Sequence, residues 1–197
     1  MFINERSRGL IEDFQDKIFH ILGCGAIGSS ASTQLCRMGA DRFVLYDLDV
    51  VEIQNIGVSH YVWKDIGKNK VEALKRHLKA INPDVDITVE PGRLSAFVKP
   101  LSEDDIVILG FDSMDSRLEA ATAALTERNR PFALIDGRMG AEEYQQYVLT
   151  NPTLMKYKDT WYSDADASED PCNAKATSYC SNMAGAFIAN AVKRLLT

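Results

Sequence analysis

Apolar residues in this chain fall in short runs that alternate with longer amphipathic stretches. Residues 16–25 contain a nearly continuous apolar run that ends in glycine, which is typical of a strand buried on both faces. Residues 28–40 are rich in small side chains and predict a helix that packs close to a sheet and ends at Gly39. Residues 42–49 form a second apolar run. Residues 17–49 therefore predict one βαβ unit of about 30 residues.

The rest of the chain repeats this alternation. Apolar positions recur at helical spacing through residues 69–82, and Asn82-Pro83 ends that helix. Residues 154–176 show no clear periodicity and predict a long loop. The other predicted elements are strands at 86–94, 103–112 and 131–140, an antiparallel strand at 144–151, and helices at 115–129 and 181–196.

Strands that alternate with helices predict an α/β fold: a Rossmann-like, doubly wound, mainly parallel sheet flanked by helices, with antiparallel strands added toward the C-terminus. We expect a single domain over residues 1–197, because no repeat or linker-like segment marks a boundary. Ligands of such sheets bind beyond the carboxyl ends of the strands. Gly23, Asp47 and Asp112 all follow predicted strands, so we expect them to converge on one crevice.

Composition excludes several classes of partner. The formal net charge of −6 argues against nucleic acid or an anionic membrane as a partner, since both favour a basic face. No apolar run approaches the ~20 residues that span a bilayer, and the acidic N-terminal segment lacks the apolar centre of a signal peptide. We therefore expect a cytoplasmic protein. The four cysteines contain no C-x-x-C pair, so neither structural zinc nor a disulfide framework is expected.

Residues 23–28, G-C-G-A-I-G, carry the glycine fingerprint of a nucleotide-binding turn. Gly23 permits the tight turn, Gly25 lets phosphate approach the backbone, and Gly28 lets the helix pack on the strand. The N-terminus of the helix favours an anion. The candidate nucleotide-binding residues of this segment are Gly23, Gly25, Ala26, Ile27 and Gly28.

An acid at a strand end completes the fingerprint. Asp47 is suited to bind ribose hydroxyls, and Asp49 follows it as a further candidate. These features fit the adenosine of NAD, FAD or ATP equally well. A glycine turn with a purely structural role is the alternative.

Three later residues separate these nucleotides. Asn55 follows Asp47 by eight positions, Lys70 begins a helix, and Asp112 follows the third buried strand. Taken singly, Lys70 is better explained as a solvated first-turn residue and Asp112 as a helix N-cap. Together they supply a cation for phosphate oxygens and a carboxylate for Mg²⁺, which a triphosphate requires and hydride transfer does not.

Five segments carry a family resemblance: "GCGAIGS", "YDLDVVEIQN", "DIGKNKVEALKRHLKAINPDV", "GFDSMDSR" and "MAGAFIANAVKRLL". In this order and spacing, which covers most of the chain, the sequence resembles the ThiF/MoeB/HesA family, bacterial relatives of ubiquitin-activating enzymes. The resemblance implies binding of ATP and Mg²⁺ and adenylation of the C-terminal glycine of a small ubiquitin-like or sulfur-carrier protein. In many members the acyl group then passes to sulfur.

The resemblance also implies roles for individual residues. The three glycines would bind the phosphates and Asp47 the ribose. Asn55 and Lys70 would lie on the phosphate side, and Asp112 would serve Mg²⁺ and the reacting centre. An N-terminal arginine that crosses a homodimer to the neighbour's ATP would be Arg8, with Arg6 as the shifted alternative.

Cysteine chemistry is a separate question. Cys172 lies in the long irregular segment, close to where family members carry a sulfur-transfer or thioester cysteine. A loop thiol near a cationic pocket can have a lowered pKa and act as a nucleophile, and an unreactive thiol is the alternative. We expect Cys180 to be buried, and Cys24 and Cys36 to be structural.

One position departs from the family pattern. Val58 stands where the family usually has an arginine, and Lys64, Lys68 and Arg138 are candidate substitutes. Two other functions stay open, the first because of Val58 and the second because the glycine turn and Asp47 also permit it. One is a non-catalytic nucleotide-binding subunit of a heterodimer, and the other is an NAD(P)-binding Rossmann protein.

Overall fold

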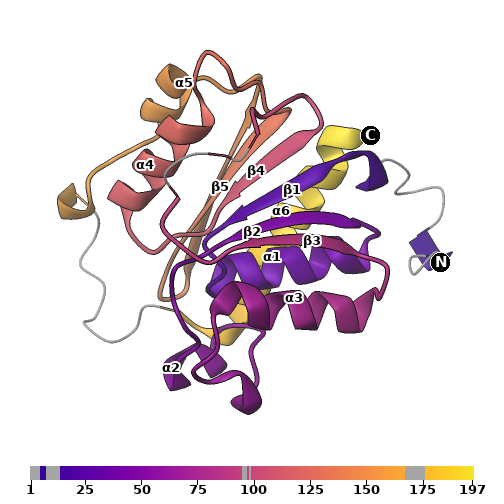
Figure 1. The fold of residues 1–197 in the computed structure, drawn as a ribbon. Helices are drawn as coiled ribbons and strands as arrows, with labels where there is room; N and C mark the ends of the chain where they lie inside the picture. The colour runs from indigo at the N-terminus through magenta and orange to yellow at the C-terminus, as the bar shows by residue number, and fades with distance from the viewer. Residues whose placement is uncertain (1–4, 8–13, 95–96, 98, 167–175) are drawn as a thin grey trace.

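A six-stranded sheet forms the centre of the computed structural model, which describes residues 5–7, 14–94, 97, 99–166 and 176–197 (Figure 1). The strand order is β3-β2-β1-β4-β5-β6, with parallel pairing except between β5 and β6. The strands are Ile18–Leu22 (β1), Arg42–Tyr46 (β2), Asp86–Glu90 (β3), Asp105–Leu109 (β4), Ala133–Gly140 (β5) and Glu143–Thr150 (β6). The predicted doubly wound sheet with an antiparallel addition is confirmed.

Helices cover both faces of the sheet. Helices α1, α3 and α6 lie on one face, and α4 and α5 lie on the other (Figure 1). The helices are Ala26–Arg37 (α1), Ile53–Ile56 (α2), Lys70–Ile81 (α3), Met114–Ala124 (α4), Leu154–Lys158 (α5) and Ser178–Leu196 (α6). Short 3₁₀ turns lie at Glu5–Ser7, Phe14–Asp16, Trp63–Asp65 and Asp164–Asp166. No helix in these described ranges is long and apolar enough to cross a membrane.

Alternate side chains of the central strands feed two hydrophobic clusters. In β4, Ile106 and Ile108 pack with α1, α3 and α6, whereas Val107 and Leu109 pack with α4 and α5. Because both faces are covered, all five residues of β4 are buried. This double burial explains why the strand appears in the sequence as a continuous apolar run.

The segment predicted as a long loop contains a helix instead. Helix α5 is capped by Thr153, whose hydroxyl accepts a hydrogen bond from the Lys156 backbone N–H. Its fully buried Tyr157 anchors it to the sheet. A five-residue helix with a single buried side chain is too short to produce a detectable period. Helix α6 begins three residues earlier than predicted, because Thr177 caps it.

Helices α1 and α6 pack closely through small residues. An added Cβ at Gly185 in α6 would lie 2.1 Å from Ser30 Oγ and 2.6 Å from the Ser30 carbonyl carbon in α1. Because one of these atoms belongs to the backbone, a rotamer change cannot relieve the clash. Gly185 therefore sets the distance between the two helices.

We predict that Gly185→Ala lowers the free energy of unfolding by about 1–3 kcal/mol, because the extra methyl overpacks the α1–α6 interface. Gly57→Ala is the matched control, since its added Cβ meets no atom within 4 Å and its φ is −74°. Denaturant unfolding measures both variants. Equal stability of the two would contradict the packing argument.

Candidate functional site

A cavity of about 780 Å³ opens where the chain leaves β1 and β4 in opposite directions. This is the topological switch point of the sheet, where ligands of doubly wound folds bind. Its lining includes Gly23, Asp47, Asn55, Lys70 and Asp112. The predicted convergence of these residues on one crevice is therefore confirmed. The volume lies in the range of ligand pockets.

The glycine segment forms the floor of the cavity. Gly23 has a φ of +90°, which disfavours any side chain. An added Cβ at Gly28 would lie 1.9 Å from the Gly23 carbonyl oxygen, so Gly28 permits α1 to start directly under the turn. Gly28 is absent from the cavity lining and serves packing.

The backbone of Gly25 faces open space. An added Cβ at this residue would meet no atom within 4 Å, and Gly25, Ala26 and Ile27 all line the cavity at the N-terminus of α1. A helix N-terminus supplies backbone N–H groups and a positive dipole end. This end of the cavity suits an anion such as phosphate.

Asp47 holds the floor in place. Its carboxylate accepts hydrogen bonds from the backbone N–H of Cys24 at 2.7 Å and of Asp49 at 2.9 Å. Burial raises the pKa of Asp47, although the nearby Lys70 ammonium opposes that rise. The side chain still borders the cavity, and its role toward a ribose stays a prediction.

Lys70 is ordered at the cavity wall and is not a solvated first-turn residue. Its ammonium lies 2.7 Å from the Asp49 carboxylate, and its side chain is 11% exposed. Burial opposes the charged form, but the Asp47 and Asp49 carboxylates outweigh it and raise the pKa of Lys70. The segment after β2 pairs with the segment before α3, through a bridge between Val50 and Asn69, and this pairing positions the lysine.

Asn55 lies on the short helix α2. Its side-chain oxygen accepts a hydrogen bond from the Glu52 backbone N–H at 2.8 Å, which caps the helix. Val58 lies one turn later and also lines the cavity, so the departure from the family pattern falls at the site itself.

Asp112 projects from the loop between β4 and α4. Ser113 caps α4 by accepting a hydrogen bond from the Ser116 backbone N–H, so the alternative of Asp112 as an N-cap is wrong. Asp112 is instead exposed and lines the cavity. Its carboxylate is a hard oxygen ligand of the kind that Mg²⁺ takes together with substrate phosphates. No group of three metal-ligating side chains occurs among the described residues.

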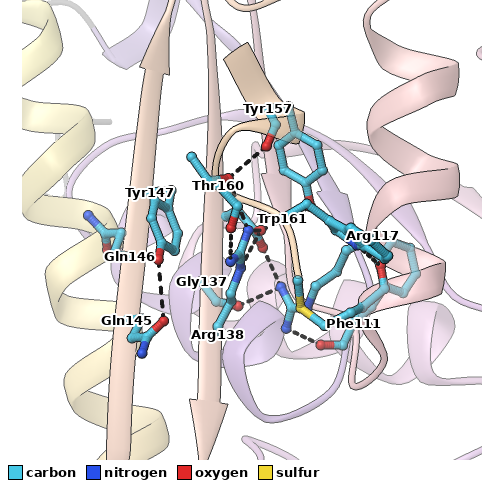
Figure 2. A network of polar contacts seen from close by, with 12 residues as sticks. Phe111, Arg117, Gly137, Arg138, Gln145, Gln146, Tyr147, Tyr157, Thr160 and Trp161 are labelled. Atoms are coloured by element: carbon cyan, nitrogen blue, oxygen red, sulfur yellow. Dashed lines mark hydrogen bonds and ion pairs between the residues drawn. The ribbon is translucent and has the colours of Figure 1, made fainter. Parts of the chain in front are cut away.

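A buried polar network anchors this loop to the rest of the fold (Figure 2). Arg117 in α4 donates to the Phe111 carbonyl, to the Asp136 carboxylate and to the Gly137 carbonyl. The second carboxylate oxygen of Asp136 accepts from Arg138 at 2.8 Å and from the Tyr157 hydroxyl at 3.0 Å. The backbone next to Asp112 is thereby tied to β5 and α5.

Arg138 belongs to this network and not to the cavity. It is 5% exposed, donates to the Thr160 carbonyl at 2.7 Å, and stacks over the Tyr147 ring (Figure 2). It lies within β5, in the strand that the sequence predicts over residues 131–140. Lys64 and Lys68 are likewise absent from the described lining of the cavity.

The remaining predicted residues either fall outside the described part of the chain or are absent from the described lining of the cavity. Arg8 and Cys172 lie outside the described residues, and Arg6 is exposed on the first 3₁₀ turn. Cys24, Cys36 and Cys180 are buried, which confirms the burial predicted for Cys180. Burial raises the pKa of Cys24 well above its usual value, which keeps this thiol protonated.

One wall of the cavity was not predicted. It consists of the loops after β3 and β4 and one side of α4, and its residues are Gly92, Arg93, Leu94, Phe111, Ser116, Glu119 and Ala120. The loop after β3 carries no motif, so only its position at a strand end signalled a place near the ligand.

Comparison with known proteins shows a family. The model of the ThiF family matches residues 5–197. Ubiquitin-like modifier-activating enzyme 5 of Drosophila mojavensis is 34% identical over 134 residues, and that of Caenorhabditis briggsae is 30% identical over 138 residues. These matches cover 60% and 62% of this chain. The chain spans about a third of the length of these relatives, 33% and 32%.

Solved structures share the fold. A crystal structure of Escherichia coli MccB with MccA-N7isoASN has a TM-score of 0.72 at 19% identity, and it covers 95% of this chain and 59% of MccB. A crystal structure of E. coli MccB with ATP has a TM-score of 0.67 at 18% identity, and the match covers 95% of this chain and 58% of MccB. The structure of TcdA (CsdL) has a TM-score of 0.68 at 19% identity, and the match covers 96% of this chain and 90% of TcdA.

We predict that Arg117→Gln lowers the free energy of unfolding by about 3–5 kcal/mol, because it removes one of two cations from the buried Asp136 carboxylate. Arg117 is 3% exposed, so solvent does not compensate for the loss. Arg128→Gln, at an exposed position after α4, is the control and is expected to change stability by about 0.5 kcal/mol or less. Chemical denaturation at neutral pH tests both, and a mild effect of Arg117→Gln would contradict the network's role.

Proposed function

Because this chain belongs to the ThiF family, we propose that it uses ATP to adenylate the C-terminal carboxylate of a small ubiquitin-like or sulfur-carrier protein. The observation that carries the proposal is the joint placement of Lys70 and Asp112 on the cavity that the glycine turn and Asp47 also line. A redox dinucleotide would use the glycine turn and Asp47 but would need neither Lys70 nor Asp112.

The proposed reaction is a displacement at the α-phosphorus of ATP. A carboxylate oxygen of the C-terminal glycine forms a bond to that phosphorus, and the bond to the departing pyrophosphate breaks. The products are an acyl-adenylate and pyrophosphate. Nothing covalent is required of the protein, which contributes by positioning and by neutralising charge.

The glycine turn and the N-terminus of α1 would hold the phosphates, and Asp47 would hold the ribose. Lys70 would exchange its contact with Asp49 for phosphate oxygens. Asp49 is 54% exposed, so water can solvate the carboxylate that is released. Asn55, whose side-chain oxygen is occupied by the α2 cap, has its amide N–H groups to offer to phosphate.

Asp112 would hold Mg²⁺, with Asp49 as a candidate for a second oxygen ligand because its exposed carboxylate also lines the cavity. The bound ion would neutralise phosphate charge and stabilise the departing pyrophosphate. The Arg117 hydrogen bond to the Phe111 carbonyl would keep the Asp112 backbone in place without touching substrate.

The acyl substrate is proposed by family analogy, and one solved structure and the curated relatives point the same way. MccB has been crystallised with MccA, and the curated relatives are activating enzymes of ubiquitin-like modifiers. We also propose a homodimer, in which Arg8 from one copy would reach the ATP of the other. That arginine would supply a cation that Val58 does not.

The valine also favours a second candidate, a nucleotide-binding subunit without activity. A missing guanidinium at the phosphates would cost about 2.7–4 kcal/mol of transition-state stabilisation if no other cation replaced it. Such a subunit would bind ATP but release no pyrophosphate, so the exchange assay below separates the two.

We predict that Asp112→Asn lowers ATP–pyrophosphate exchange at least about 100-fold in the presence of a ubiquitin-like acceptor and Mg²⁺, because the metal loses its charged ligand. Asp115→Asn is the control, because this exposed residue starts the same helix without lining the cavity. The assay uses a panel of acceptors ending in glycine. Absence of exchange with every acceptor, together with binding of NADH, would overturn the proposed function.

A second step would be assigned by Cys172→Ala. If Cys172 attacks the acyl-adenylate, its thiolate displaces AMP and forms a thioester. We then expect the alanine variant to retain exchange and to form no reducible adduct with the acceptor on a non-reducing gel. Cys180→Ala, at a buried site, is the control, and an adduct that persists in Cys172→Ala would exclude this residue.

A further inference from the structure

Two residues of opposite charge face each other across the unpredicted wall of the cavity. Arg93 follows β3, Glu119 lies on α4, and their guanidinium and carboxylate groups lie 2.7 Å apart. Both residues line the cavity. The pair therefore joins the loop after β3 to α4 at the edge of the cavity.

Arg93 is one of two cations among the described residues that line the cavity, and the other is Lys70. The two differ in how firmly they are held. Lys70 is 11% exposed and tied to Asp49, whereas Arg93 is 76% exposed and its partner Glu119 is 50% exposed. An ion pair this open to water is weakly held, so a ligand can exchange with it at little cost.

The surroundings of the pair are apolar and suit a flat ring. Leu94, Phe111 and Ala120 line the cavity here and pack in the same hydrophobic cluster as Tyr46. The anion-binding features, the N-terminus of α1 and Lys70, lie toward the other face of the sheet, because Ile27 and Val71 beside them pack in the opposite hydrophobic cluster. With phosphates at the glycine turn and ribose at Asp47, a base extends toward the Arg93 wall.

We propose that Arg93 and Glu119 form a clamp that selects a purine with an exocyclic amino group. The Glu119 carboxylate accepts a hydrogen bond from the 6-amino group of adenine, and the Arg93 guanidinium stacks on the ring. A 6-oxo purine presents a carbonyl oxygen to the same carboxylate and is rejected. This inference rests on the proposed function, since it assumes that the cavity binds a nucleoside triphosphate.

The test compares ATP with ITP, which differ at the 6-position of the base. Isothermal titration of the full chain with each nucleotide and Mg²⁺ is expected to show about tenfold tighter binding of ATP to the unmodified protein. Glu119→Ala is expected to bring the ATP:ITP ratio close to one. Glu119→Gln is expected to do the same while binding both nucleotides, because an amide can accept from an amino group or donate to a carbonyl.

Arg93→Ala is expected to weaken ATP and ITP alike by about threefold to fivefold, because stacking does not depend on the 6-substituent. Arg128→Ala and Glu127→Ala, exposed residues beyond the cavity lining, are the matched controls and are expected to leave both affinities unchanged.

The outcomes separate the two proposals. If the protein binds ATP but Glu119→Ala keeps the full preference over ITP, the clamp is overturned and the adenylation proposal stands. Equal binding of ATP and ITP by the unmodified protein also overturns the clamp. If neither nucleotide binds, both proposals fail.

Discussion

The site depends on the contact of three glycine backbones at the switch point of the sheet. The turn at Gly23, the first turn of α1 at Gly28 and the end of β4 at Gly110 approach so closely that an added Cβ at each would lie within 3.1 Å of a neighbouring backbone atom. This contact brings the ends of β1 and β4 together beneath the cavity. The backbone of Gly25 remains open above it, so the N-terminus of α1 faces the ligand.

Charged groups around this floor divide into those that hold the protein together and those that remain available to a ligand. Asp47 ties the glycine turn to the segment after β2, and Asp136 ties the loop after β4 to β5 and α5. Both carboxylates are well buried, where an unpaired charge would be strongly destabilising. Asp112, Asp49, Arg93 and Glu119 are exposed, and exposed charges exchange partners at little cost.

The cations of the cavity match those that family resemblance suggested only in part, at Lys70. Val58 occupies the expected arginine position, and Arg138 is neutralised by Asp136 on the other side of β5. On the described cavity wall the positive charges come from the start of α3 and from the loop after β3. The fold can supply a cation from either strand end, because the carboxyl ends of all five parallel strands meet at one edge.

The sequence by itself determined the sheet and the cavity floor. Buried parallel strands leave continuous apolar runs, and the glycine turn leaves a fixed spacing, so Gly23, Asp47, Lys70 and Asp112 were found from local pattern alone. Only the tertiary structure decided which charged side chains are neutralised inside the protein and which are exposed to a ligand. Arg117 and Asp112 stand five residues apart in one motif, yet one is buried against Asp136 and the other is exposed at the cavity. Arg93 and Glu119, 26 residues apart, meet only because β3 ends and α4 begins at the same edge of the sheet. Such pairings depend on long-range packing, which leaves no periodic signal in the chain.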